Sequence, residues 1–153
     1  MNRDFKDILL LFEKYDVEYL IVGGYAVIRY TQPRYTKDLD LWVRPNKENA
    51  AKVCRALREF GAPLIEVTEA DFADTGLQYM IGLSPCAIDF LTSISGLDFD
   101  EAWLSKKEFI ASACRVYYVS PRDLIRSKRA TGRTQDLADI EEILRILPDA
   151  DKS

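Results

Sequence analysis

The chain has 153 residues, 48% of them apolar and 30% charged, which suits a folded domain with a buried core and excludes a disordered or fibrous protein. It contains no histidine, so histidine bases, histidine-bound zinc and serine–histidine triads are excluded. No apolar run approaches the ~18 residues of a membrane span. The N-terminal segment is unlike a signal peptide, and the three cysteines lack metal-binding spacing. We therefore expect a cytoplasmic protein with reduced thiols and no membrane contact.

The net charge of −4 is unevenly distributed along the chain. Residues 115–133 carry six basic side chains and one acid, which leaves a net charge of about −9 on the rest of the chain. A basic helix that faces an acidic site would suit a polyphosphate substrate. A solvated helix face would give the same pattern, so the charge alone does not decide between the two.

Hydrophobic periodicity and turn residues predict alternating helices and strands in the first 60 residues. Asn46 is a typical helix N-cap, Gly61 a typical helix end, and Pro33 stops the helix before it. The predicted elements are a helix at 3–16, a strand at 17–22, a helix at 24–31, a strand at 38–43 and a helix at 46–60.

The second half of the chain begins with a mixed pattern at 62–76 that predicts no element. Ser84-Pro85 marks a hairpin turn, and Ser120-Pro121 marks a helix start. The predicted elements are strands at 78–83 and 86–92, a short helix at 98–104, strands at 107–112 and 114–119, a helix from 121 and a last helix at 134–147. Five apolar residues indicate that the last two helices pack on the core: Leu124, Ile125, Leu137, Ile140 and Ile143. The whole pattern predicts one α+β domain over residues 1–153.

Three carboxylates stand in predicted strands. Asp38 and Asp40 are two residues apart, so they share one face while Leu39 and Leu41 face the core. Asp89 lies between apolar neighbours in a later strand. If the two strands pair, the three carboxylates converge, and a divalent cation would relieve their repulsion. Oxygen-only ligation favours Mg²⁺ or Mn²⁺, ions that activate a hydroxyl and bind a transferring phosphate. A solvated strand edge is the alternative for the Asp-x-Asp pair.

Gly23 and Gly24 join the first strand to a helix start. Small residues at this position expose backbone N–H groups, and the helix dipole favours an anion there. A plain tight turn is the alternative. The sequence has neither the Gly-Lys-Ser/Thr of a P-loop nor the Gly-x-Gly-x-x-Gly of a dinucleotide fingerprint, so a phosphate would be bound in another fold.

The order of these motifs resembles the nucleotidyltransferases of the DNA polymerase β superfamily, with Gly-Gly, then Asp-x-Asp, then a third acid on a distant strand. Three segments are similar to small bacterial nucleotidyltransferases related to the AbiEii toxin family: VGGYAVIRY…RYTKDLDLWV, CAIDFLTSISGLDFDEAW and VSPRDLIRSKRATGRTQDLADIEEI. The similarity covers about residues 5–147. It implies a palm-like mixed sheet flanked by helices, with a core at about 17–92 and a C-terminal β-hairpin and helix pair at about 105–147.

The resemblance also implies an activity and its residues. The enzyme would transfer NMP from an NTP to a hydroxyl of an RNA, a protein or a small molecule, and a toxin-like role would add an antitoxin partner. Gly23 and Gly24 would bind the triphosphate through backbone amides. Asp38, Asp40 and Asp89 would bind Mg²⁺ or Mn²⁺, and Asp89 would also take the proton of the acceptor.

Further nucleotide-binding residues follow from the same resemblance. Thr36 and Lys37 would meet phosphate oxygens, while Lys128 and Arg133 would lie against the nucleotide. Asp136 belongs to the same motif, but Asp136 or Asp139 could instead cap the helix or form a salt bridge. Many relatives have a Ser where Gly24 stands and carry a further C-terminal domain that recognises the acceptor, so the acceptor stays open.

Other classes of protein also fit parts of the pattern. Haloacid-dehalogenase-type phosphatases use Asp-x-Asp, but there the acids follow a hydrophobic strand, whereas residues 32–37 are polar. A module with the nucleotidyltransferase fold that binds nucleotide or a partner protein without turnover is the main alternative. A small domain with no site is the remaining one.

Overall fold

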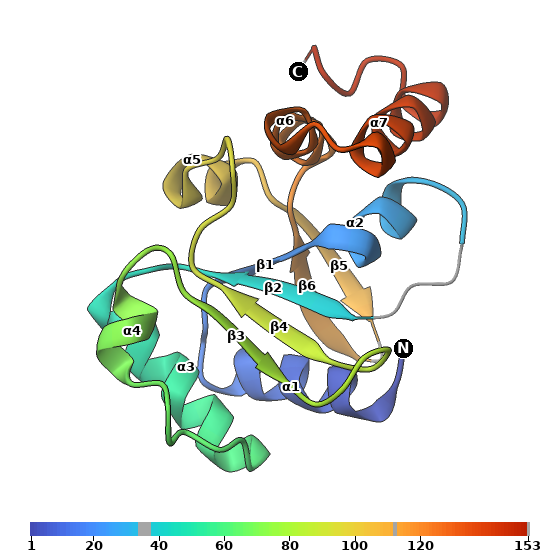
Figure 1. Ribbon diagram of the computed structural model, residues 1–153. Coiled ribbons are helices and arrows are strands. Elements are labelled where there is room, and N and C mark those ends of the chain that lie inside the picture. Colours follow the sequence, from blue (N-terminus) through green and yellow to red (C-terminus); the bar gives the residue numbers. More distant parts are fainter. Residues whose placement is uncertain (34–37, 112, 153) are drawn as a thin grey trace.

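The computed structural model describes residues 1–33, 38–111 and 113–152 and places a six-stranded sheet between two groups of helices (Figure 1). The strands are β1 (Tyr19–Val22), β2 (Leu39–Val43), β3 (Gln78–Ile81), β4 (Ile88–Leu91), β5 (Lys107–Ala111) and β6 (Cys114–Tyr118). Their order across the sheet is β3-β4-β2-β1-β6-β5. β1 pairs antiparallel with β2 and parallel with β6, and β2 pairs parallel with β4. The predicted α+β class with a mixed sheet is confirmed.

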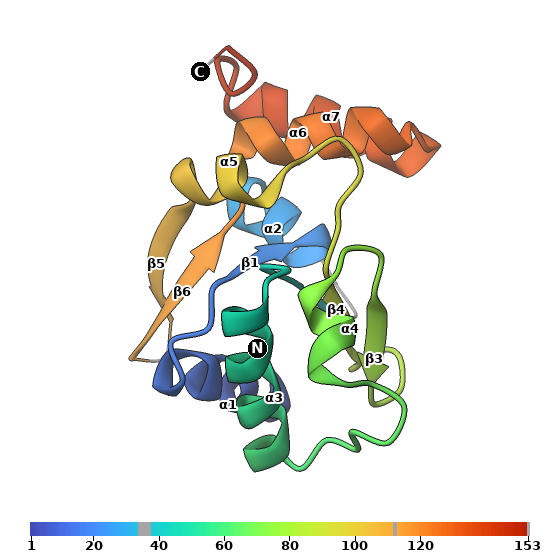
Figure 2. The same ribbon diagram turned by 90° about the vertical axis from the view of Figure 1, so that its left-hand side faces the viewer.

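The helices cover both sides of this sheet. They are α1 (Arg3–Lys14), α2 (Gly23–Tyr30), α3 (Lys47–Phe60), α4 (Glu69–Ala73), α5 (Phe99–Leu104), α6 (Pro121–Thr131) and α7 (Thr134–Ile146). Figures 1 and 2 show α1 and α3 together on one side, with α2, α6 and α7 on the other. In the part of the chain that the structure describes, no helix is long and apolar enough to cross a membrane.

The local signals of the sequence place the helix ends correctly. The Asn46 side chain accepts a hydrogen bond from the Asn49 backbone N–H at the start of α3, and Gly61 ends this helix with a φ of +92°. Ser120 caps α6 in the same way by accepting from the Asp123 N–H. These caps satisfy backbone groups that a helix end leaves without partners, so they fix the bounds within a residue or two of the prediction.

The core residues follow the predicted faces with one exception. Leu39 and Leu41 on β2, and Ile88 and Phe90 on β4, are buried as their alternation predicts. Leu137 was expected in the core and is 53% exposed, so that prediction is wrong. The buried face of α7 consists of Asp136, Asp139, Ile140 and Ile143, which share the helical spacing that Leu137 lacks.

The segment 62–76, for which no element was predicted, contains the short helix α4. A capping box between Thr68 and Asp71 starts this helix, and the fully buried Phe72 packs edge-on against Tyr79 of β3, with ring centroids 6.2 Å apart. Because only one of the five residues of α4 is buried, the sequence shows too little hydrophobic periodicity to predict a helix there. α4 packs against α3, so it covers the core near the edge of the sheet.

The turn after β4 is fitted closely to α6 at Gly96. This glycine has a φ of +79°, and a Cβ on it would lie 2.9 Å from the Ala130 Cβ and 3.4 Å from the Arg126 carbonyl oxygen.

We predict that Gly96→Ala lowers the free energy of unfolding by about 1–3 kcal/mol from backbone strain, with a further loss from the clash. Gly76→Ala is the matched control, since Gly76 has a φ of +92° and open space around it. Equal losses in denaturant unfolding would contradict the close fit.

Candidate active site

The pairing of β2 with β4 brings two of the predicted carboxylates side by side. In this parallel pair, Asp40 is the register partner of Asp89. On the other side of β2, Asp40 is opposite Val22, the last residue of β1. α2 begins at the next residue, Gly23. The glycine turn and both acids therefore lie at the same end of the sheet.

Gly23 packs directly against the carboxylate of Asp40. It has a φ of +67°, and a Cβ at this position would overlap Asp40 Oδ2, so only glycine fits. The N-cap residue of α2, Val22, gives no side-chain hydrogen bond to the helix. The N-cap side chain therefore caps none of the first N–H groups of α2, including that of Gly24, and these groups lie beside the acids. Such a helix start binds anions well.

Asp89 is buried and only half satisfied. The side chain of Gln78 on β3 donates a hydrogen bond to Asp89 Oδ2 at 2.8 Å, while the buried Oδ1 has no partner in the described part of the chain. Burial, and then the charge of Asp38, raises the pKa of Asp89. A buried carboxylate oxygen without a partner is costly, so this atom points to a ligand or a proton that belongs there.

Asp38 does not join the other two acids in this structure. Its Oδ1 accepts a hydrogen bond from the Ala87 backbone N–H at 3.0 Å, and its Oδ2 accepts one from the Ser84 hydroxyl at 2.8 Å. Accordingly, within residues 1–33, 38–111 and 113–152, no three acidic or cysteine side chains are grouped closely enough to bind a metal ion. The predicted convergence is therefore present for Asp40 and Asp89 and absent for Asp38.

The carboxyl of Asp40 carries the largest change of acidity at this end of the sheet. Burial raises its pKa to about 7, with further contributions from the charges of Asp89 and Asp38. The ammonium of Lys128 acts in the opposite direction. Repulsion between Asp40 and its acidic neighbours is what a cation would relieve.

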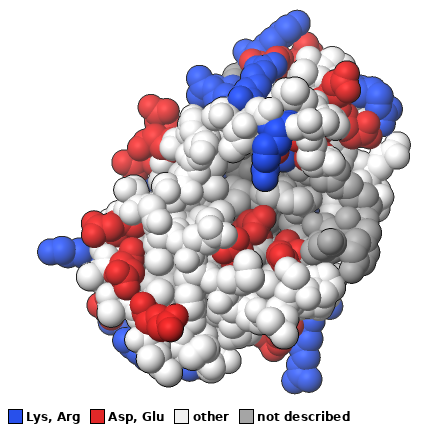
Figure 3. All heavy atoms as spheres, viewed as in Figure 1, with Lys and Arg blue, Asp and Glu red and all other residues white. Residues whose placement is uncertain are grey.

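An open cleft of about 260 Å³ lies beside Asp40. Figure 3 shows acidic atoms at the bottom of a hollow on this face of the molecule, with basic side chains above it. The lining residues come from the ends of β1 and β4, the start of α2, β2, the turn after β4, α6, α7 and the turn between these two helices: Val22, Gly23, Asp40, Leu91, Ser93, Ile94, Ser95, Leu124, Ser127, Lys128, Thr131, Arg133 and Asp136. Four predicted site residues thus meet in one cleft: Gly23, Asp40, Lys128 and Arg133.

Lys128 and Arg133 belong to a charged network between α6 and α7. The ammonium of Lys128, whose side chain is 12% exposed, lies 2.9 Å from Asp139 Oδ2 and 3.4 Å from Asp136 Oδ1. Arg133 Nε lies 2.8 Å from Asp136 Oδ2, and this hydrogen bond is the main reason that the pKa of Asp136 is well below its usual range. Asp136 therefore caps α7 and pairs with two cations, which is the structural role that the sequence had left open. Thr36 and Lys37 lie outside the described residues.

Two polar residues near the acids escaped the sequence analysis. Gln78 contacts Asp89, and Ser84 contacts Asp38. Met80 of β3 is the register partner of Asp89, so Gln78, two residues away, shares its face of the sheet. The predicted hairpin around Ser84-Pro85 could have identified Gln78, because the register of the hairpin defines which residues of β3 face Asp89.

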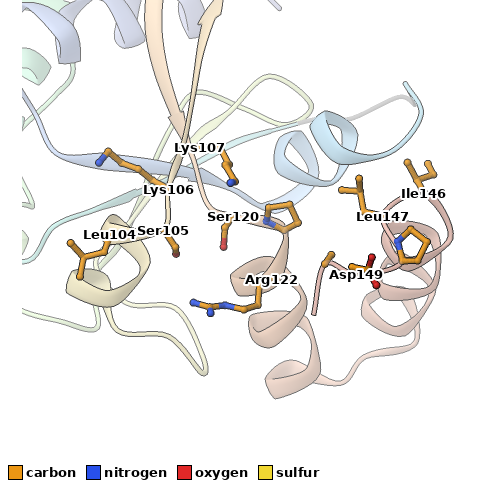
Figure 4. A pocket seen from close by; sticks show the side chains of 12 residues that line it. Leu104, Ser105, Lys106, Lys107, Ser120, Arg122, Ile146, Leu147 and Asp149 are labelled. Carbon is orange, nitrogen blue, oxygen red and sulfur yellow. The ribbon is translucent and has the colours of Figure 1, made fainter. Parts of the chain in front are cut away.

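A larger cavity lies elsewhere in the described part of the chain. It has a volume of about 580 Å³ and is formed by residues from the α5–β5 turn, the start of α6 and the end of α7 (Figure 4). Lys106, Lys107 and Arg122 line it together with Asp149 and several apolar side chains. It shares no lining residue with the cleft beside Asp40. We therefore choose the candidate site by its carboxylates and its glycine turn rather than by the volume of the cavity.

The chain belongs to a family described as nucleotidyltransferase of unknown function (DUF6036), whose sequence model matches residues 2–146. Comparison with proteins of curated function gives no match. The family confirms the nucleotidyltransferase part of the resemblance seen in the sequence. Membership of the AbiEii-related subgroup stays a prediction.

Solved structures of nucleotidyltransferases have the same fold. The antibiotic-resistance factor ANT(2'')-Ia is 18% identical, with a TM-score of 0.63 over 94% of this chain and 82% of that one. The lincomycin-bound lincosamide antibiotic adenylyltransferase LnuA is 16% identical, with a TM-score of 0.57 over 95% and 98%. A nucleotidyltransferase-like protein from Paracoccidioides brasiliensis is 18% identical, with a TM-score of 0.55 over 95% and 75%. At these identities the likeness establishes the fold alone.

The raised pKa of Asp40 predicts a pH-dependent effect of Asp40→Asn on the metal-free protein. In the folded protein the pKa of Asp40 is about 7, whereas in the unfolded chain this carboxyl ionises near its ordinary pKa of 3.8. The native state therefore binds the extra proton, and this part of the stability is lost as the pH rises from about 4 to about 7. Asn has no such loss, so above pH 7 the variant should be more stable than wild type by on the order of 1–2 kcal/mol, allowing for screening.

Thermal unfolding of both proteins at several pH values measures this difference. The gap between the two midpoints should widen from pH 4 to pH 7 and then stay constant. A gap that is independent of pH would contradict the raised pKa of Asp40.

Proposed function

We propose that the protein is a metal-dependent nucleotidyltransferase that transfers NMP from an NTP to a hydroxyl group of a small molecule. The observation that carries this proposal is the position of the Asp40–Asp89 pair beside the start of α2 at Gly23. Family membership supports a nucleotidyltransferase in general terms. The reaction, the ion and the acceptor are the further steps that we propose.

The residues at this site fit Mg²⁺ or Mn²⁺. The ligand atoms that Asp40 and Asp89 offer are carboxylate oxygens, which these hard cations prefer. Asp89 Oδ1 is buried and has no partner in the described part of the chain, and Asp40 lies directly across the strand pair. Asp38 would be the third ligand after its Oδ2 gives up the hydrogen bond from Ser84. A bound divalent ion would supply charge neutralisation at the triphosphate and would make the acceptor hydroxyl more acidic.

The side chains and amides of the chain would perform the remaining tasks. The N–H groups of Gly23 and Gly24 would bind the triphosphate at the start of α2. The acceptor oxygen would then bond to the α-phosphorus, and the bond from this phosphorus to the pyrophosphate would break. Asp89 would also take the proton of the acceptor hydroxyl, a role that suits a carboxyl with a raised pKa. Arg133, with a side chain that is 76% exposed at the cleft, would contact the nucleotide.

The names of the structural neighbours favour a small-molecule acceptor. One is an antibiotic-resistance factor, and another is an antibiotic adenylyltransferase with lincomycin bound. An RNA or protein acceptor, together with a toxin-like role and an antitoxin partner, is the version that the AbiEii resemblance favours. A labelling experiment with all three acceptor classes distinguishes these versions.

The test is the incubation of the purified protein with each α-³²P-labelled NTP, Mg²⁺ or Mn²⁺, and separate pools of small hydroxyl metabolites and antibiotics, RNA, and protein. We expect label in the small-molecule pool. Asp38→Asn combined with Asp40→Asn should lower the rate by about 10³-fold or more, because it removes several kcal/mol of charge stabilisation. The same double variant should unfold near the wild-type temperature, since it also removes repulsion between carboxylates.

The other outcomes decide between the alternatives. Label in RNA or protein would keep the reaction and replace the acceptor. Absence of label with any NTP, while calorimetry still detects nucleotide binding, would contradict the transferase and favour a binding module. A metal-free double variant that unfolds far below wild type would show that Asp38 and Asp40 have a structural role.

A further inference from the structure

Asp38 is bonded at both oxygens to the segment that leads into β4. Ala87 is fully buried, and its N–H bonds Asp38 Oδ1 while its carbonyl oxygen accepts the N–H of Leu39 at 3.0 Å. This donor is therefore fixed by the pairing of β2 with β4. The second donor, the hydroxyl of Ser84, is on the exposed β3–β4 turn. It can be removed without disturbing the core.

This arrangement lowers the repulsion within the acidic site. Asp40 and Asp89 are neighbours across the strand pair, and Asp38 adds to the charge that both experience. Two hydrogen bonds stabilise the Asp38 carboxylate outside the group that could bind an ion. Three converging carboxylates repel one another when no cation is bound. Holding Asp38 away from the other two acids reduces this repulsion.

We propose that Ser84 is a positioning residue that retains Asp38 outside the ion site until a divalent cation binds. Asp38 then exchanges the Ser84 hydroxyl for the ion and completes the ligand set with Asp40 and Asp89. This inference rests on the proposed function, because it concerns the same ion. It adds that ion binding competes with the hydrogen bond from Ser84, so this turn determines the affinity of the site.

If the ion and Ser84 compete for Asp38, removal of the hydrogen bond from Ser84 should raise the affinity for the divalent ion. Ser84→Ala removes the donor to Asp38 Oδ2, and the carboxylate then reaches the ion without breaking that bond. Because a hydrogen bond to a charged group is worth about tenfold or more in an equilibrium constant, and water replaces part of it, we expect about fivefold to tenfold tighter Mn²⁺ binding. Ser84→Thr retains the hydroxyl and should stay within about twofold of wild type.

The experiment titrates each protein with Mn²⁺ alone and measures the free ion by electron paramagnetic resonance. Ser105→Ala is the matched control, since it also removes a serine hydroxyl bonded to an aspartate, Asp123, at 2.7 Å but outside the cleft. This control should bind Mn²⁺ as wild type does. Circular dichroism of every variant verifies that it is folded.

Each outcome supports or overturns the proposal. Tighter binding by Ser84→Ala alone supports it. Unchanged or weaker binding by Ser84→Ala, with normal binding by wild type, overturns the role of Ser84 and leaves the proposed function standing. The same change in Ser105→Ala also overturns it. Absence of Mn²⁺ binding in wild type and Ser84→Ala overturns both the metal-dependent function and the role of Ser84.

Discussion

The in-register parallel pairing of β2 with β4 is the constraint on which the candidate site depends. It places Asp40 beside Asp89 while their chain neighbours, Leu41 and Phe90, are buried in the core. A shift of the pairing by one residue would turn the acids inward and the apolar side chains outward, so the core fixes the site. The glycine turn is joined to the same pair, because Gly23 leaves no space for a side chain next to Asp40.

Three buried carboxylates, Asp89, Asp136 and Asp139, fall into two groups with opposite electrostatics. Asp136 and Asp139 between α6 and α7 are paired with Lys128, and Asp136 also with Arg133. Asp89 instead has one buried oxygen without a partner in the described residues, and its pKa is raised where that of Asp136 is lowered. Carboxylates paired with cations stabilise the folded chain. Carboxylates whose ionised form is disfavoured by burial and by like charges are typical of functional sites.

Local chemistry in the sequence was sufficient for most of the fold and for part of the site. Caps at Asn46 and Ser120, and alternation along β2 and β4, predicted the elements and the faces of Asp40 and Asp89. The contacts of Asp38 with the β3–β4 turn could not be predicted, because they depend on how side chains of distant segments meet. The sequence left a salt bridge at the Asp136 motif open but did not identify Lys128 as the partner, for the same reason. The exposure of Leu137 was missed because an apolar residue was assumed to be buried.

The position of a bound ion tests this account most directly. Crystals grown with Mn²⁺ and a non-hydrolysable NTP analogue would locate the ion by anomalous scattering. The account predicts a peak at bonding distance from carboxylate oxygens of Asp40 and Asp89, with the triphosphate at the start of α2. A nucleotide bound in this cleft with no Mn²⁺ between these two acids, or with the ion bound elsewhere on the protein, would contradict it.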